Sequence, residues 1–382
     1  MRSTGAILWE VGEEWSVEEI DILPPGRGEV LIEWKAAGLC HSEEHFVTGD
    51  FVTPAKIREE AGLPSPFPML GGHEGAGIVI EAGDGVTDVI PGDLVASSFM
   101  PSCGRCRHCT RGHQNLCQQG AALMLPGQMT DGVVRHFCRG QPLNLYSKCG
   151  TFARHSILSE QSVIKVDPSL PPAVVALVSC GVATGWGSAV YRAATVAGDT
   201  VVVVGCGGVG MNAVQGAAMA GAKTIVAVDP VEFKRRSATQ FGATHSCASM
   251  TEAINLVRDL TYGDMADRVI MVPSVMYGDL MSEAMTLTAK GGTCVVTAVA
   301  PALQAEASIN LMQLAMFNKE VKGTIFGSGN PRFDVPNLLS MYAAGKLKLD
   351  ELVTRTYPLE DINRGYEDMR QGRNIRGVIV FD

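Results

Sequence analysis

The sequence predicts an α/β protein of two domains, one rich in short strands and one built on a parallel sheet. The chain has 382 residues, more than a single ordinary hydrophobic core accommodates. Its first half carries short apolar or alternating runs bounded by glycine, proline and aspartate. From about Gly181 onward, almost wholly apolar runs alternate with segments of helical length, which is typical of a parallel sheet covered on both faces.

The first domain is expected to comprise residues 1–181 and 323–382. Its strands are predicted where apolar runs end in turn residues such as Gly83-Asp84-Gly85 and Pro91-Gly92-Asp93. These strands are expected at residues 29–34, 77–81, 93–97 and, at the end of the chain, 376–381.

The second domain is expected to comprise residues 182–322. Its first strand, the valine run at 201–204, precedes a helix that extends to about Ala220. Further strands are predicted at residues 224–228, 268–272 and 293–297, each separated by a segment of helical length.

The composition is that of a compact soluble protein with well-buried elements. Hydrophobic residues make up 46% of the chain and the net charge is −9, which disfavours nucleic acid and anionic membranes as partners. The apolar stretch 200–222 contains six glycines and follows a strand, so a buried strand-turn-helix explains it better than a membrane span. No secretory signal is visible, and eleven cysteines favour metal or thiol chemistry in a cytoplasmic protein.

A four-cysteine loop at residues 103–117 predicts a structural metal site. Zn²⁺ prefers four soft ligands at tetrahedral corners, and thiolates a few residues apart supply them at small conformational cost. The alternative, a pair of disulfides in a secreted protein, does not fit the remaining composition. Four thiolates leave no open position, so this zinc would stiffen the loop; the ligands are Cys103, Cys106, Cys109 and Cys117.

A glycine-rich turn after the valine strand predicts a dinucleotide site. Residues 205–210 fit G-x-G-x-x-G, with Gly205 for a tight turn, Gly207 for backbone approach to a pyrophosphate and Gly210 for close packing of helix and strand. The start of the helix, at Gly208 and Val209, offers free N–H groups to phosphates. Asp229 ends the next strand, where a carboxylate accepts ribose hydroxyls and favours NAD over NADP; alternatively it caps the following helix.

Three further residues, Cys40, His73 and Cys180, stand among glycines and polar neighbours. Taken singly, each has an ordinary explanation as a small core residue or a hydrogen-bonded turn histidine.

The whole set of motifs resembles the zinc-dependent medium-chain alcohol dehydrogenases. The resemblance covers essentially the full chain and rests on the Gly-His-Glu signature at 72–74 with Gly77, Gly83 and Val86, on the cysteine loop and on the glycine fingerprint. Within that family the chain is most similar to actinobacterial nicotinoprotein enzymes. These hold their cofactor tightly and are assayed with a nitrosoaniline acceptor, and some are linked to mycofactocin.

The resemblance implies a GroES-like catalytic domain, a Rossmann domain that binds NAD, and two zinc ions per subunit. It implies that Cys40, His73 and Cys180 ligate the catalytic zinc. The other roles that it implies are Glu74 behind the metal, Glu43 orienting His73, Ser42 and His45 in a proton relay, His41 at the cofactor pyrophosphate, Lys234 at the adenosine ribose, Arg376 at a phosphate and Phe99 on a wall of the alcohol pocket.

The expected reaction is oxidation of an alcohol to an aldehyde or ketone by hydride transfer to NAD, with a redox partner to reoxidise bound NADH. Family habit and an edge position for 293–297 suggest a homodimer or tetramer. Residues 51–60 are extra relative to most of the family and lie near the expected substrate mouth. The alternatives are a glutathione-dependent formaldehyde dehydrogenase and a nucleotide-binding protein without turnover; the latter is disfavoured because all three ligands are present.

Overall fold

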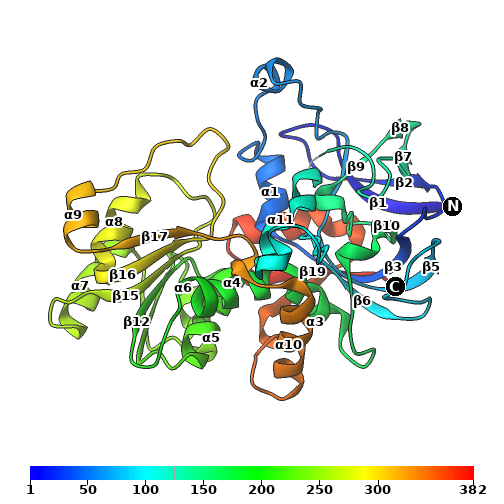
Figure 1. Ribbon diagram of the computed structural model, residues 1–382. Coiled ribbons are helices and arrows are strands. Elements are labelled where there is room, and N and C mark those ends of the chain that lie inside the picture. Colours follow the sequence, from blue (N-terminus) through cyan, green and yellow to red (C-terminus); the bar gives the residue numbers. More distant parts are fainter. Residues whose placement is uncertain (124) are drawn as a thin grey trace. The chain divides into compact units, whose positions relative to one another are not determined.

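The computed structural model describes residues 1–123 and 125–382, which form two compact units (Figure 1). One unit comprises Met1–Cys180 and Asn330–Asp382, and the other Gly181–Gly329. Residues 323–329, expected in the first domain, therefore belong to the second unit. The reason is a close backbone approach: a Cβ on Gly187 would lie 2.6 Å from the carbonyl oxygen of Gly327.

The first unit contains two sheets whose strands are mostly antiparallel. One has the order β8-β7-β2-β1-β4-β9. Its strands are β1 (Arg2–Leu8), β2 (Ser16–Ile22), β4 (Met69–Leu70), β7 (His136–Cys138), β8 (Gln141–Pro142) and β9 (Asn144–Leu145).

The other sheet has the order β11-β6-β5-β3-β19-β18, and β10 also pairs with β3. Strand β3 is central, since it pairs antiparallel with β5, β10 and β19. The apolar runs predicted from sequence lie in this sheet, with Trp34 and Val79 buried in the core below it. Its strands are β3 (Glu29–Gly38), β5 (Glu74–Ala82), β6 (Leu94–Ser97), β10 (His155–Ser159), β11 (Val163–Lys165), β18 (Val353–Tyr357) and β19 (Arg376–Val380).

Most helices of the first unit are short, and the exception, α10 (Pro331–Ala343), has 13 residues. Helix α1 (His41–Val47) begins after the extended Cys40, and Glu43 and Glu44 in its first turn suit the positive end of the helix dipole. The others are α2 (Ala55–Glu60), α3 (Pro172–Leu177) and α11 (Ile362–Arg370), with 3-10 turns η1 (Cys109–Arg111), η2 (Gln114–Leu116), η3 (Gln118–Ala122), η4 (Tyr146–Lys148), η5 (Glu160–Ser162), η10 (Asp350–Leu352) and η11 (Leu359–Asp361).

The second unit is a six-stranded sheet in which every pairing is parallel. The order β14-β13-β12-β15-β16-β17 is the doubly wound 3-2-1-4-5-6 arrangement of the Rossmann fold, so the predicted fold class is confirmed. The strands are β12 (Thr200–Val204), β13 (Thr224–Val228), β14 (His245–Cys247), β15 (Ala266–Met271), β16 (Thr288–Val296) and β17 (Glu320–Gly323).

The edge position expected for residues 293–297 is wrong. These residues fall mostly in β16, which pairs with β15 on one side and β17 on the other. The edge strand on this side is β17, a short and half-polar segment that sequence periodicity did not indicate.

Helices flank this sheet and one long helical stretch leads into the unit. The flanking helices are α5 (Gly208–Met219), α6 (Glu232–Ala238), α7 (Met250–Leu260), α8 (Leu280–Leu287) and α9 (Leu311–Met316), with 3-10 turns η8 (Thr239–Phe241) and η9 (Phe326–Ser328). The stretch Pro172–Arg192 runs through α3, η6 (Val178–Val182), α4 (Ala183–Gly187) and η7 (Ser188–Arg192). By length and apolarity alone it is long enough to cross a membrane, but 83% of its apolar window is buried, as in the core helix of a globular protein.

Candidate functional site

Four buried side chains converge in the first unit: Cys40, His73, Glu74 and Cys180. Their donor atoms all lie within 4.8 Å of one another. Cys40 immediately precedes α1, His73 and Glu74 lie at the start of β5, and Cys180 lies in η6. Two thiols and an imidazole at this separation fit one tetrahedral Zn²⁺, because ligands at about 2.0–2.3 Å from the metal lie about 3.5–4 Å apart.

Glu43 determines which imidazole nitrogen of His73 is available. Its Oε1 lies 2.5 Å from Nδ1 of His73, and both side chains are buried. A carboxylate on one nitrogen fixes the ring orientation and leaves Nε2 for a metal ion. The predicted partnership of Glu43 and His73 is thus present in the structure.

Glu74 is held on its other side by Arg376. The Nη2 atom of Arg376 donates to Glu74 and also to the carbonyl oxygen of Leu39, at 3.0 Å. The pair is almost fully shielded from solvent. Arg376 was expected at a cofactor phosphate. Its Nη2 atom is already engaged by Glu74 and Leu39, so a phosphate would have to bind its other nitrogens.

The electrostatics of the group favour a thiolate at Cys40, whereas hydrogen bonding to Cys40 and burial raise the pKa of Cys180. The Cys180 side chain, by hydrogen bonding, lowers the pKa of Cys40, and the neighbouring His73 adds to this. Burial acts against the charged imidazolium, yet Glu43 and Cys40 raise the pKa of His73. Burial raises the pKa of Glu43 to about 7 and also raises that of Glu74, which Arg376 partly offsets.

The predicted relay residues lie on α1. The Cys40 thiol donates to Oγ of Ser42 at 3.4 Å, so this hydroxyl stands beside the candidate metal group. The ring of His41 packs edge-on against His45 at a centroid distance of 4.9 Å. His45 is 2% exposed, and its Nδ1 lies 3.4 Å from Oδ2 of Asp50. Asp50 was missed from sequence, although it follows His45 by only five residues across a turn.

Aromatic rings line the imidazole. Phe99 meets His73 edge-on at 5.3 Å between centroids, and its place on the wall of an alcohol pocket stays a prediction. Tyr146 is buried 5.2 Å from the same ring. No sequence signal identified Tyr146, because it lies in a 3-10 turn far along the chain.

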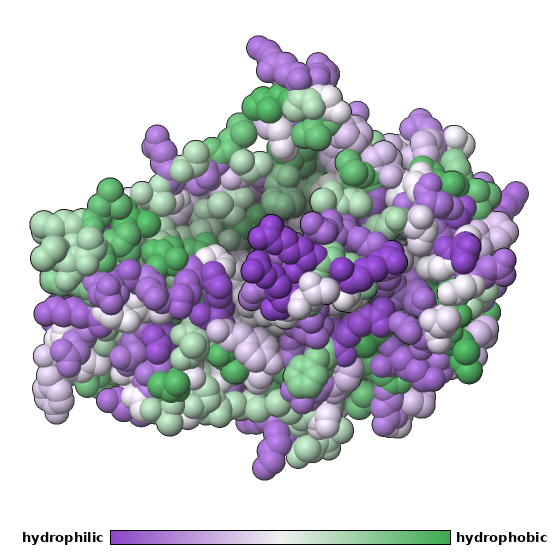
Figure 2. Space-filling view, in the orientation of Figure 1, coloured by the Kyte–Doolittle hydropathy of each residue, from purple (hydrophilic) through white to green (hydrophobic). Residues whose placement is uncertain are grey.

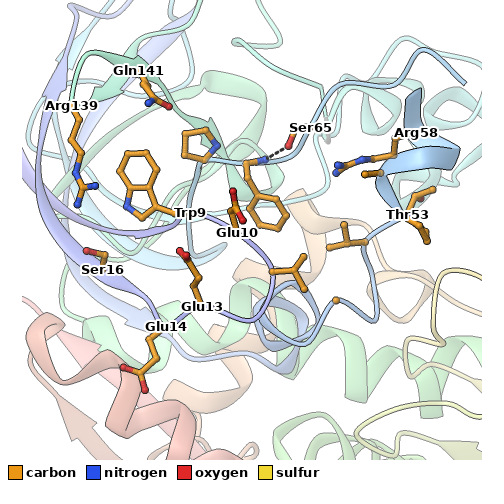
Figure 3. A pocket seen from close by; sticks show the side chains of 17 residues that line it. Trp9, Glu10, Glu13, Glu14, Ser16, Thr53, Arg58, Ser65, Arg139 and Gln141 are labelled. Atoms are coloured by element: carbon orange, nitrogen blue, oxygen red, sulfur yellow. Dashed lines mark hydrogen bonds between the residues drawn. The ribbon is translucent and has the colours of Figure 1, made fainter. Parts of the chain in front are cut away.

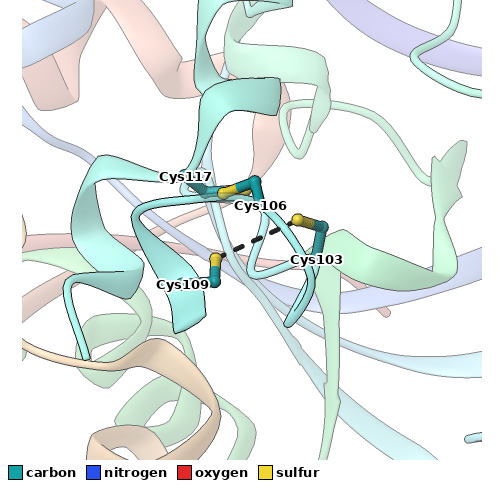
Figure 4. Close-up of side chains that lie close together, drawn as sticks. All are labelled: Cys103, Cys106, Cys109 and Cys117. Carbon is teal, nitrogen blue, oxygen red and sulfur yellow. Dashed lines mark hydrogen bonds between the residues drawn. The ribbon is translucent and has the colours of Figure 1, made fainter. Parts of the chain in front are cut away.

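The four-cysteine loop forms a second candidate metal group. The Sγ atoms of Cys103, Cys106, Cys109 and Cys117 all lie within 4.8 Å of one another (Figure 4). Gly112 ends η1 in the left-handed conformation, which lets the loop turn back toward Cys117. Four thiols of which none forms a disulfide suit one Zn²⁺ with a closed coordination shell.

The glycine fingerprint of the second unit shows three different constraints. Gly205 has φ +97° and leaves no room for a Cβ beside the carbonyl oxygen of Val272. A Cβ on Gly210 would overlap the carbonyl oxygen of Gly205, so helix and strand pack closely there. Beside Gly207, by contrast, no atom of the described residues lies within 4 Å of an added Cβ. Gly207 thus leaves open space at the N-terminus of α5, where Gly208, Val209 and Gly210 form the first turn.

Asp229 lies at the end of β13 and is already engaged within the chain. Its Oδ2 accepts from the N–H of Cys206 and its Oδ1 from that of Val231, both at 2.8 Å. The carboxylate therefore joins the fingerprint turn to Val231, the residue before α6. No side chain of the described residues caps α6, so the capping alternative is wrong, and each oxygen of Asp229 keeps a further lone pair for a ribose hydroxyl. Lys234 is half-buried one turn further on, and Arg235, missed from sequence, donates to the Asp229 carbonyl.

Two family models match the chain in the order of its units. Residues 26–168 match the alcohol dehydrogenase GroES-like domain and residues 208–344 the zinc-binding dehydrogenase domain. Among curated proteins, alcohol dehydrogenase B of Mycobacterium tuberculosis is 49% identical over 100% of this chain and 99% of its own. An NDMA-dependent alcohol dehydrogenase of Amycolatopsis methanolica is 46% identical over 100% of this chain and 99% of its own.

A solved structure supports the same assignment. Benzyl alcohol dehydrogenase of Acinetobacter calcoaceticus superposes with a TM-score of 0.88 at 26% identity, with both chains fully covered. The similarity in sequence extends over the whole length of the relatives, and the donor groups expected of the family are present. The chain belongs to the zinc-dependent medium-chain alcohol dehydrogenase family, close to its actinobacterial members.

Proposed function

We propose that this alcohol dehydrogenase works with zinc at Cys40, His73 and Cys180 and with NAD at the second unit, and that it retains the nicotinamide between turnovers. The observation that carries the proposal is the donor set itself: two thiols and one imidazole converge, while the fourth group, Glu74, is engaged by Arg376. Two cysteines and a histidine are the ligands already known for the catalytic zinc of alcohol dehydrogenases, with the fourth position left open.

The chain's own residues position and move a proton. When bound, zinc acidifies a hydroxyl and NAD accepts a hydride. Ser42 stands next to Cys40 and would accept the proton of an alcohol held there. His45 is buried but faces Asp50, whose side chain is 25% exposed, so the proton has an exit to solvent. Phe99 would bound the pocket against the His73 ring.

Ser42→Ala tests the relay separately from metal binding. We expect the variant to lose most turnover and to keep both zinc and NAD, because the hydroxyl moves a proton and the thiols hold the ion. Unaltered turnover would refute the relay.

Retention of the cofactor is supported by the relative whose name records NDMA dependence. Its test uses purified protein that has been dialysed extensively and then denatured. We expect about one NAD(H) released per chain, measured by an enzymatic cycling assay. Protein that comes through dialysis empty would contradict retention while leaving the dehydrogenase assignment in place. A retained NADH needs a redox partner or small acceptor to reoxidise it.

A second copy of the chain is the expected partner in assembly. Strand β17 leaves its outer edge unpaired among the described strands, and α9 nearby exposes Leu311, Met312 and Met316 by about 70% each. Hydrophobic side chains gather over the region of α9 in Figure 2. An exposed edge beside an apolar helix is a surface that oligomers cover. Light scattering that finds a monomer at micromolar concentration would refute this assembly. We also propose that the protein is cytoplasmic.

A further inference from the structure

A large cleft opens in the first unit at the base of α2, the helix of the extra segment. It has a volume of about 1030 Å³, which is close to the upper end of the range of small-molecule sites, about 300–1,000 Å³. Its lining comes from the β1–β2 connection, from the chain around α2 and from β8. None of the candidate zinc ligands or relay residues lines it.

Arg58 of α2 brings an unpaired positive charge to this cleft. Its side chain points from α2 toward Ser65 in Figure 3. Its Nε and Nη1 atoms are shielded from solvent and have no hydrogen-bond partner in the described part of the chain. Shielding a charged group without a partner costs free energy, and an anion that pairs with the guanidinium would recover part of that cost. A carboxylate is the planar anion that guanidinium groups prefer.

The other arginine of the cleft is already occupied. Arg139 donates to both carboxylate oxygens of Glu18, at 2.6 and 2.9 Å, and lies 4.5 Å above the ring of Trp9. It therefore stiffens one wall instead of awaiting an anion. Arg139 also provides a matched control for Arg58.

The remainder of the lining is apolar on one wall and acidic at the rim. Trp9 and Phe67 are half-buried, and Phe67 packs against Phe46 of α1 at 6.5 Å between centroids. Three exposed carboxylates line the side from which the β1–β2 connection approaches, away from Arg58 in Figure 3; they are Glu10, Glu13 and Glu14. Within residues 1–123 and 125–382 these three form no ion pair. Opposite charges at two sides of a cleft with one aromatic wall suit a ligand that is itself charged at both ends.

We propose that this cleft binds a small zwitterion with an apolar body, such as a short peptide, whose carboxylate pairs with Arg58 and whose ammonium group faces the glutamates. The aromatic wall receives the apolar body. The site does not depend on the zinc and NAD chemistry proposed above.

Three peptides measured by isothermal titration calorimetry on the full-length protein separate the two charges. The probes are glycylphenylalanine, its C-terminal amide and its N-acetyl form. We expect the free acid to bind at least tenfold more tightly than the amide. The N-acetyl form should bind a few-fold more weakly than the free acid, since the glutamates are exposed and screened.

Two variants test whether the carboxylate of glycylphenylalanine pairs with Arg58. In Arg58→Gln the acid and the amide should bind equally, whereas Arg139→Gln should keep the preference for the acid. Thermal melts of both variants verify folding, and Arg58 lies on an exposed helix. Absence of glycylphenylalanine binding, or an acid preference that survives Arg58→Gln, would overturn the proposal. Full retention of affinity by the N-acetyl form would overturn the role of the glutamates.

Discussion

Replacing Glu43 by glutamine is expected to weaken the zinc site at Cys40, His73 and Cys180 without altering its ligands. Glu43 is 0% exposed and its Oε1 lies 2.5 Å from Nδ1 of His73. Glutamine preserves the shape and an acceptor but removes the charge. A hydrogen bond to a buried charged group contributes about 1.5–3 kcal/mol, and loss of such a partner costs a metal site about 10- to 100-fold in affinity, or about 1.4–2.7 kcal/mol.

The assay is competition with a coloured zinc chelator, in which weaker binding at this site appears as zinc released at a lower chelator concentration. Glu44→Gln is the matched control, because Glu44 is the next residue of α1 and is equally buried but pairs with Arg370 at 2.9 Å. Zinc retained by Glu43→Gln as tightly as by the native chain, or lost equally from Glu44→Gln, would refute the reasoning.

Three further results are expected. Gly207→Ala should lose NAD affinity at unchanged thermal stability, since its Cβ meets open space. Gly210→Ala should lose NAD affinity and also lower the melting temperature of the second unit. Equal melting temperatures of the two variants would contradict this. Burial, helped by Arg135, lowers the pKa of His136 to about 3. Below pH 6.5 the unfolded chain therefore binds a proton at His136 that the folded chain does not bind. The free energy of unfolding should fall by about 1.4 kcal/mol per pH unit below 6.5, and by less in His136→Gln. Cys106→Ser should release zinc from the loop and lower the melting temperature, while the zinc at the other site stays bound.

The fold was predictable where local pattern and tertiary structure agree. Residues 224–228 form β13 with the bounds expected from the apolar run, and the glycine turn opens α5 as its spacing indicated. Fully buried parallel strands and their phosphate-binding turn have strong sequence signatures because every residue of the run is constrained.

The remainder depended on contacts between distant residues. Arg376 pairs with Glu74 across 302 positions, and Gly327 packs on Gly187, which moved the unit boundary. Neither contact leaves a periodic pattern in the sequence. The convergence of Cys40 and Cys180 was expected from family resemblance and not from spacing, since no local motif joins residues so far apart.

Elemental analysis of the zinc content of the purified chain and of Cys180→Ala decides whether Cys40, His73 and Cys180 hold a metal ion. We expect two zinc ions per native chain and one in the variant, with the cysteine loop still loaded. One zinc in the native chain, or two in both proteins, would contradict this expectation.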